Sequence, residues 1–162
     1  MTLAREMALE SEYVMGTFAR KPVEFVEGHG MTLIDDAGNE YLDFLSGIGV
    51  CSLGHCHPSI VQAVSDQAAK LIHVSNYYYI EHRGEVAQLL SNMLNVYVDE
   101  PSPETWKTFF ANSGAEANEC AIKLARLYAR RRTEAAGKDA ELAPRLIVTL
   151  AKSFHGRTLA TL

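Results

Sequence analysis

The sequence predicts an α/β protein in which a mainly parallel sheet, covered by helices on both faces, follows a smaller segment of mixed α and β structure. Three observations lead to this fold class. Two short apolar runs, residues 106–111 and 146–150, each have the length and composition of a buried strand. Between them, residues 115–136 carry apolar side chains at helical spacing. Strand, long helix and strand form a parallel βαβ unit with a right-handed crossover, which is normally part of a larger sheet.

The first part of the chain predicts shorter elements. Gly38 and Asn39 tolerate positive φ, so residues 35–39 are expected to close a hairpin. Pro58 is expected to open a helix, because the N–H that proline lacks would have no partner at the first helical position. The other expected elements are short strands in 23–44, a glycine-rich loop at 46–57, a helix from 58 to about 71, a helix at 81–94 and a loop at 99–104.

The order of these elements suggests two domains. Residues 1–75 are expected to form the N-terminal segment of a small domain with its linker, and residues 76–162 the beginning of a large domain. Two strands cannot make the sheet that a parallel pair requires, and the sequence stops at Leu162 within an apolar stretch. We therefore expect the chain to be the N-terminal part of a longer protein.

Composition restricts the classes of function. The 162 residues are 48% hydrophobic and 22% charged, with a net charge of −5, as in ordinary globular proteins. No basic stripe is present, which argues against nucleic acid as a partner. No run of 18 apolar residues is present, and the N-terminus lacks a signal-peptide core, so neither a membrane span nor secretion is expected. Three cysteines suit a reducing cytoplasm, and we expect a cytoplasmic protein.

A helix N-terminus after the first predicted strand is the strongest candidate site. Ser113 is a good N-cap, and Glu116 three residues later completes a capping box. We expect the Ser113 hydroxyl to accept from the N–H of Glu116, and the Glu116 carboxylate to accept from the N–H of Ser113. The N–H groups of Gly114 and Ala115 would then remain for an anion such as phosphate. A capping box also occurs where a helix is simply capped.

Residues Ser153 to Thr158 follow the second predicted strand. Because ligands bind at the carboxyl ends of strands in open α/β sheets, this segment is expected to lie beside the first site. Phe154 has a flat face on which an aromatic ring could stack, and the planar guanidinium of Arg157 could bind a carboxylate through two N–H groups. Gly156 would allow a tight turn between them. Alternatively, Phe154 could belong to the core, His155 could be a satisfied buried histidine and Arg157 could form a surface ion pair.

These two segments resemble the signatures of class III aminotransferases, which have the fold type I architecture of pyridoxal-phosphate-dependent transferases. The similar segments are Phe110 to Arg126 and Ser153 to Thr158, together with Gly54 to Pro58 and Tyr41 to Phe44. The resemblance implies that Ser113, Gly114 and Ala115 bind the phosphate of pyridoxal 5'-phosphate. It also implies that Phe154 stacks on the cofactor ring and that Arg157 holds the substrate's α-carboxylate.

The opening of the chain, Tyr13 to Val23, is most similar to acetylornithine aminotransferases. The resemblance implies transamination between N-acetylornithine and 2-oxoglutarate in arginine biosynthesis, by a homodimer. Ornithine, succinylornithine and 4-aminobutyrate aminotransferases share the signatures and remain alternatives. No lysine here matches the Schiff-base position, and Lys152 is only the nearest lysine to the predicted site. That lysine is expected beyond Leu162, so this chain alone is expected to be inactive.

Three other readings remain open. Cys51, His55, Cys56 and His57 are dense enough to suggest zinc, although adjacent ligands converge poorly on one ion, and no metal site is expected. The helix N-terminus could belong to a non-catalytic module that binds phosphate or a nucleotide. The aromatic run Tyr77 to Tyr79 could serve a purely structural dimer interface, which the aminotransferase interpretation also expects.

Overall fold

A computed structural model describes residues 2–96 and 106–162 of the chain. These residues group into two compact units, Met1–Tyr78 and Tyr79–Leu162. Each unit is held together by its own contacts. The predicted boundary after residue 75 separates the small and large domains of a longer protein, so it stays a prediction.

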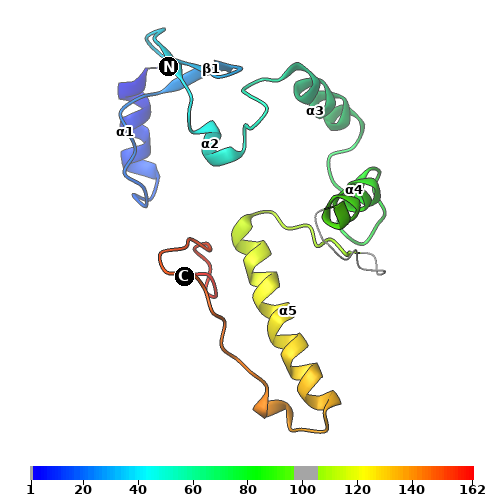
Figure 1. Cartoon of the computed structure of the whole chain (residues 1–162). Helices are drawn as coiled ribbons and strands as arrows, with labels where there is room; N and C mark the ends of the chain where they lie inside the picture. Colours follow the sequence, from blue (N-terminus) through cyan, green and yellow to red (C-terminus); the bar gives the residue numbers. More distant parts are fainter. Residues whose placement is uncertain (1, 97–105) are drawn as a thin grey trace. The chain divides into compact units, whose positions relative to one another are not determined.

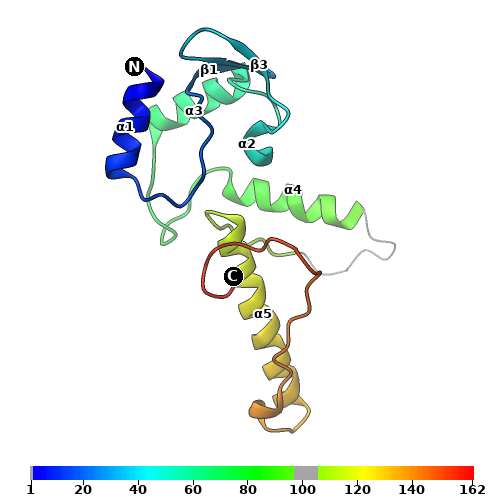
Figure 2. The same cartoon turned by 90° about the vertical axis from the view of Figure 1, so that its left-hand side faces the viewer.

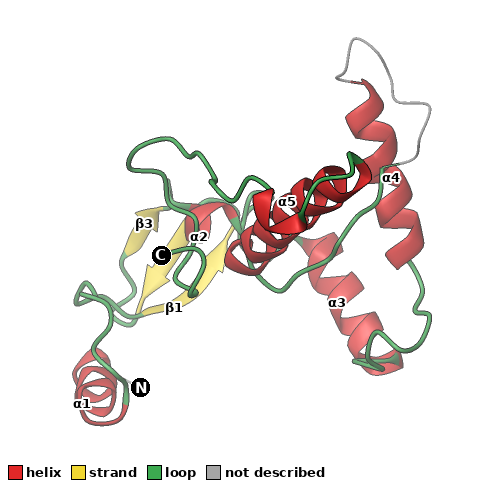
Figure 3. Cartoon of the chain, turned by 90° about the horizontal axis from the view of Figure 1, so that it is seen from below, coloured by secondary structure: helices red, strands yellow, loops and turns green. Residues whose placement is uncertain are grey.

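The first unit contains a three-stranded antiparallel sheet (Figures 1 and 3). Its strands are β1 (Phe25–His29), β2 (Thr32–Asp35) and β3 (Glu40–Leu42), in the order β1-β2-β3. The rings of Phe25 and Tyr41 meet edge to face, with their centroids 5.4 Å apart. The short strands predicted within residues 23–44 are confirmed.

The turn between β2 and β3 is organised by the carboxylate of Asp35, which is 7% exposed. Asp35 accepts hydrogen bonds from the backbone N–H groups of Ala37 and Asn39, from the Asn39 side-chain amide and from the Tyr41 hydroxyl. Gly38 adopts a φ of 84°, the left-handed conformation that a glycine tolerates. The predicted hairpin is confirmed, and its turn is held by side chains as well as by the backbone.

The helix α1 (Leu3–Tyr13) was not predicted. None of its side chains is buried, so it lacks the apolar stripe on which periodicity arguments depend. Its residues are nevertheless mostly good helix formers, namely Leu, Ala, Arg, Glu and Met. The N–H of Leu3 donates to the Asp36 carboxylate at 2.8 Å, which ties this helix to the β2–β3 turn.

The segment 46–57 is a loop, as predicted, with one tight turn labelled α2 (Ser46–Gly49). Gly47 and Ile48 have φ values of 59° and 62°, so this turn is left-handed rather than part of a regular helix. After this loop, α3 (Pro58–Lys70) begins with proline at its first position and His57 as its N-cap residue. The predicted role of Pro58 is confirmed.

The second unit contains α4 (Arg83–Val96), α5 (Gly114–Ala135) and the short 3₁₀ helix η1 (Ala140–Leu142). The predicted helices at 81–94 and 115–136 are confirmed to within two residues at each end, the usual uncertainty of helix boundaries. After η1 the chain runs back along α5 toward its N-terminus (Figures 1 and 2). The loop predicted at residues 99–104 lies outside the described residues.

The two parallel strands predicted at residues 106–111 and 146–150 are not formed. A strand is stable only where its N–H and C=O groups meet those of a neighbouring strand. No backbone hydrogen bond joins these two runs within the part of the chain that the structure describes. Apolar side chains along the second run stay exposed, among them Leu146 and Val148, each at 93%. The prediction was wrong for this chain because an apolar run indicates a segment suited to a sheet interior, but it does not provide the neighbouring strands with which that segment would form hydrogen bonds.

Apolar side chains are broadly exposed in both units. None of them is buried among residues 2–96 and 106–162. Three exposed apolar residues, Ile60, Val61 and Val64, lie on α3, and three others, Leu124, Leu127 and Tyr128, lie on α5. Such faces normally pack against another layer of structure. Within the same residues, no helix has the length and apolar character needed to cross a membrane.

Candidate functional site

The N-terminus of α5 is capped by Ser113. Its backbone is extended, with φ −156° and ψ 163°, and its hydroxyl oxygen accepts from the N–H of Glu116 at 3.2 Å. This is the N-cap geometry that satisfies one of the unpaired amides of a first helical turn. The predicted capping role of Ser113 is confirmed.

The second half of the expected capping box is different. The Glu116 carboxylate accepts from the N–H of Asn112, at 2.8 Å, and not from that of Ser113 as predicted. Successive N–H groups of an extended backbone point in opposite directions. The glutamate side chain therefore reaches past the cap residue to the preceding amide. As a consequence, the N–H of Ser113 is left without the carboxylate partner that the sequence suggested.

Three consecutive amides at this helix end lack an acceptor in the part of the chain that the structure describes. Within the described residues, no hydrogen bond is made by the N–H groups of Ser113, Gly114 or Ala115. A Cβ placed on Gly114 would meet no atom within 4 Å, so the space beside this amide is open. Because the helix dipole adds a partial positive charge at the same place, the arrangement suits an anion such as a phosphate group.

The segment 153–158 packs directly against this helix end. An atom at the Cβ position of Gly156 would lie 2.6 Å from the Ala115 methyl carbon and 2.5 Å from the Thr161 hydroxyl oxygen. Gly156 also has a φ of 141°, a conformation that residues with side chains rarely adopt. Only glycine fits here, and it brings the second predicted segment into contact with the first, as expected.

Two further side chains of α5 hold the segment in place. The Asn118 amide donates to the carbonyl of His155 at 2.7 Å. The Glu119 carboxylate accepts from the Thr158 hydroxyl at 2.6 Å and from the N–H of Ala160 at 3.1 Å. Sequence reasoning assigned no role to either residue. The available signal was their position, about one turn after Gly114 and Ala115, where side chains share a helix face with those residues.

The environment of Glu119 favours its ionised form. The Thr158 hydroxyl holds the pKa of this carboxyl below its ordinary value, and the N–H of Ala160 acts in the same direction. Partial burial opposes the shift, while the positive charge of Lys123 supports it. A carboxylate is therefore present at neutral pH to accept both hydrogen bonds.

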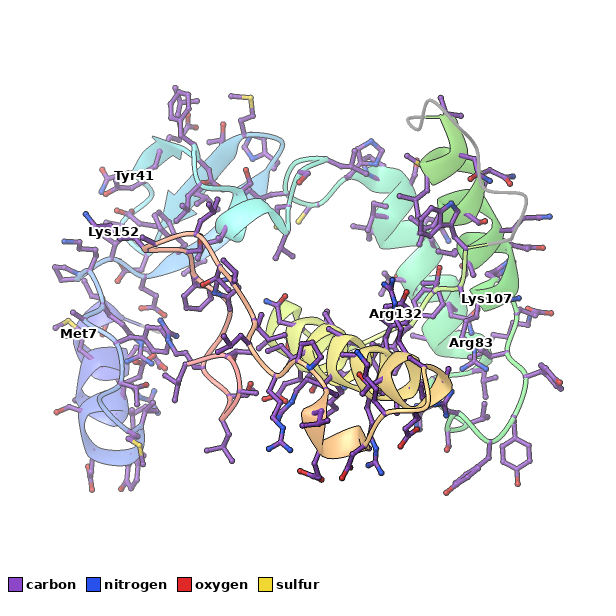
Figure 4. The ribbon with its side chains drawn as sticks, turned by 60° about the horizontal axis from the view of Figure 1, so that its bottom comes forward. Met7, Tyr41, Arg83, Lys107, Arg132 and Lys152 are labelled. Carbon is purple, nitrogen blue, oxygen red and sulfur yellow. The ribbon has the colours of Figure 1, made fainter. Side chains whose placement is uncertain are left out.

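Phe154 and Arg157 lie on either side of the His155–Gly156 pair. The Arg157 guanidinium carbon is 5.6 Å from the centre of the Phe154 ring, which is a cation–π distance. Phe154 is 76% exposed, so it is not the core residue that was considered as an alternative. Lys152, labelled in Figure 4, lies just before this segment with a φ of 63°. The individual ligand contacts of Phe154 and Arg157 stay predictions.

The cysteine- and histidine-rich loop in the first unit has a different arrangement. His55 Nε2 lies 2.7 Å from Asp43 Oδ2, and both side chains are largely shielded from solvent, with 20% and 8% exposed. This contact holds the pKa of Asp43 below its usual value, and the N–H groups of Leu45 and Ser46 add to the effect. No group of three potential ligands is placed to hold a metal ion in residues 2–96 or 106–162.

Comparison with known proteins assigns the family. Residues 17–162 match the model of the class III aminotransferases. The acetylornithine aminotransferase of Nitrosomonas europaea is 49% identical over 150 residues, which are 93% of this chain and 34% of that protein. The chain thus spans about a third of the length of the curated relatives it matches.

Two solved structures are also similar. The acetylornithine aminotransferase of Elizabethkingia anophelis superposes with a TM-score of 0.68 at 32% identity, over 85% of this chain and 33% of that one. The ornithine aminotransferase of Toxoplasma gondii has a TM-score of 0.71 at 32% identity, over 82% of this chain and 29% of that one, and has pyridoxal phosphate at partial occupancy in its active site. The predicted fold class, fold type I, is confirmed by these likenesses. The chain belongs to the class III aminotransferases.

Proposed function

We propose that the full-length product of the gene that encodes this chain transfers an amino group between N-acetylornithine and 2-oxoglutarate. This reaction is a step of arginine biosynthesis, and its cofactor is pyridoxal phosphate. One observation carries the proposal. Three consecutive amides at the N-terminus of α5 have no acceptor among the described residues, and Gly156 packs against the same turn. The choice of N-acetylornithine is supported by the acetylornithine aminotransferases that are 44% to 49% identical to the chain.

The residues present fit this cofactor. A phosphate needs several donors and positive potential, which the amides of Ser113, Gly114 and Ala115 and the helix dipole supply. An aromatic ring needs an apolar face, and the exposed ring of Phe154 supplies one. These four residues would hold the cofactor.

The roles of the chain's own residues follow from their chemistry. Arg157 would bind the α-carboxylate of the amino donor and of 2-oxoglutarate through its planar fork of N–H groups. When bound, pyridoxal phosphate would act as an electron sink for the bond that breaks at the carbon bearing the transferred amino group. The helix end and the segment 153–158 would therefore bind and orient the reactants.

The family's catalytic lysine has no matching motif among Lys21, Lys70, Lys107, Lys123, Lys138 and Lys152. We accordingly propose that the 162-residue chain alone does not catalyse transamination. Assay of the purified chain with N-acetylornithine, 2-oxoglutarate and added cofactor tests this proposal. Formation of glutamate above the rate without protein would contradict it.

We also propose that the protein works as a homodimer in the cytoplasm. Tyr77 and Tyr79 support the dimer, since their side chains are 93% and 102% exposed in this chain and aromatic side chains are enriched at interfaces. Sedimentation of the full-length product of the gene that encodes this chain would measure its oligomeric state. A monomer at micromolar concentration would contradict a stable dimer.

The substrate is tested on the same full-length gene product. Its kcat/KM is compared for N-acetylornithine, ornithine, N-succinylornithine and 4-aminobutyrate, each with 2-oxoglutarate. We expect the highest value for N-acetylornithine, and a higher value for any other donor would assign that substrate instead. Phosphate binding without transamination of any donor would favour the non-catalytic phosphate-binding module.

A further inference from the structure

Two polar side chains of α5 bracket the residues to which substrate and cofactor contacts were assigned. Asn118 binds the carbonyl of His155, before Gly156 and Arg157, and Glu119 binds Thr158 and Ala160, after them. All three hydrogen bonds join residues 37 to 41 positions apart. They fix the separation between the segment and the helix whose first amides form the anion site.

Glu119 has the larger share of this linkage. Its Oε1 accepts two hydrogen bonds, and the Thr158 hydroxyl that donates one of them is also 2.8 Å from the Thr161 hydroxyl. The N–H of Thr158 donates to the same Thr161 oxygen at 3.0 Å. The backbone immediately after Arg157 is therefore held at several points, and two of these hydrogen bonds, from the Thr158 hydroxyl and the Ala160 N–H, end on the Glu119 carboxylate of α5.

Packing and hydrogen bonding act on the same short stretch. Gly156 leaves no room against Ala115, so the segment cannot move closer to the helix. The bonds of Asn118 and Glu119 oppose movement away from it. Arg157 lies between these constraints, and a small displacement of its backbone would move its long side chain relative to the helix end.

We propose that Glu119 is a positioning residue for substrate binding: its bonds to Thr158 and Ala160 hold Arg157 in register with the helix N-terminus, without Glu119 touching substrate. The inference rests on the proposed function, because it uses the carboxylate-binding role of Arg157. Glu119 then controls the affinity for carboxylate substrates, and Asn118 assists from the other side of Gly156.

The test uses Glu119→Ala and Glu119→Gln in the full-length gene product. Glu119→Ala removes the oxygen that accepts both hydrogen bonds, and we expect the KM for the amino donor and for 2-oxoglutarate to rise about tenfold, the cost of losing hydrogen bonds to a charged group. Glu119→Gln keeps an oxygen that can accept both bonds and should restore most of the affinity. Glu134→Ala is the control, because Glu134 lies on the same helix and its carboxylate pairs with Arg130 rather than with the segment at 155–160.

A purely structural role gives a different result. Loss of folded protein lowers the apparent kcat in proportion and leaves KM unchanged. The effect through Arg157 is checked by a double-mutant cycle with Arg157→Lys, in which Glu119→Ala should add little to the KM of the single variant. An unchanged KM for Glu119→Ala, or full additivity with Arg157→Lys, would overturn the proposal.

A second measurement does not depend on turnover. Hydrogen exchange of the Thr158 and Ala160 amides in the full-length gene product should accelerate in Glu119→Ala and not in Glu134→Ala. Thr158→Val removes the hydroxyl and nearly preserves shape, so it repeats the kinetic test if Glu119→Ala fails to fold. If the parent protein shows no transamination, the proposed function fails. Unchanged exchange overturns the positioning role by itself.

Discussion

Ala115 and Gly156 are in such close contact that no side chain fits between them. An atom at the Cβ position of Gly156 would lie 2.6 Å from the methyl carbon and 3.0 Å from the α-carbon of Ala115. Gly156 also has a φ of 141°, which a residue with a side chain rarely adopts. Ala115 and Gly156 are 41 positions apart in sequence. The two segments of the candidate site thus meet at a position where a single added side-chain carbon would force them apart.

Gly156→Ala is therefore expected to separate the segments. The clash with Ala115 and the unfavourable φ should together destabilise the full-length gene product by about 2 kcal/mol or more. Affinity for pyridoxal phosphate should fall as well, because Phe154 would move with the segment. Denaturant unfolding and cofactor titration measure the two effects.

Gly84→Ala is the matched control. Gly84 lies in α4, and a Cβ there meets no atom within 4 Å, so the variant should be as stable as the parent or slightly more so. Equal behaviour of the Gly156 and Gly84 variants would show that the contact with Ala115 has no energetic consequence.

The helix start at Gly114 could be predicted because its signals are local. Ser113 and Glu116 form the expected cap contact, and Pro58 opens α3 for a similarly local reason. The predicted donor to the Glu116 carboxylate was wrong by one residue: it is the N–H of Asn112 and not that of Ser113, because the extended backbone of Ser113 decides which amide the carboxylate reaches. The anion site consequently has three amides available where the sequence suggested two.

Long-range features were harder to predict from the sequence. The position of the segment 153–158 beside the start of α5 was expected from a general rule for strand ends, although the strands themselves are not formed in this chain and the specific contact between Gly156 and Ala115 was not predicted. The bonds of Asn118 and Glu119 to the segment at 155–160 depend on register across about 40 residues, which no local pattern specifies. Similarly, α1 was missed because its helix has no buried face.

A pH dependence is expected at the β2–β3 turn. The Asn39 side-chain amide holds the pKa of Asp35 below its ordinary value, and the N–H groups of Asn39 and Ala37 and the Tyr41 hydroxyl add to this, while burial opposes it. The ionised carboxylate therefore stabilises the turn above the unfolded-state pKa of about 3.9. This contribution is lost as the pH falls through the lower, folded-state pKa.

Titration of the Asn39 resonances by NMR, with selectively labelled asparagine in the full-length gene product, measures this shift. The transition should occur at lower pH in the folded protein than in urea. Asp35→Asn should abolish it, whereas Asp36→Asn, which neutralises the neighbouring carboxylate that accepts from the Leu3 N–H, should leave it in place. Identical transitions in folded and unfolded protein would show that the Asp35 network has no preference for the ionised form.

The exposed apolar surface leads to a prediction for the 162-residue chain itself. No apolar side chain is buried in the described residues, and the runs at 106–111 and 146–150 lack partner strands. The purified chain should therefore be loosely packed or aggregate, bind a hydrophobic dye and lack a cooperative thermal transition. Calorimetry decides the question, and a sharp melt of a monomeric sample would prove the expectation wrong.

The anion site can be tested at a single atom, the amide hydrogen of Gly114. Proline suits this position because Gly114 is the first residue of α5, where proline is tolerated, and because Ser113 before it is already extended. A Cβ at position 114 meets no neighbour, so Gly114→Ala adds the side-chain carbon and keeps the N–H. The two variants therefore differ chiefly in the presence of the donor.

Gly114→Pro should weaken binding of pyridoxal phosphate to the full-length gene product by tenfold or more, since a hydrogen bond to a charged group contributes about 1.5–3 kcal/mol. Gly114→Ala should bind nearly as the parent does. Pyridoxal, which has no phosphate, should bind both variants alike, and this ligand separates loss of the amide from a general disturbance of the helix end. If Gly114→Pro lowers the affinity for both ligands equally, the amides at this helix end do not bind the phosphate.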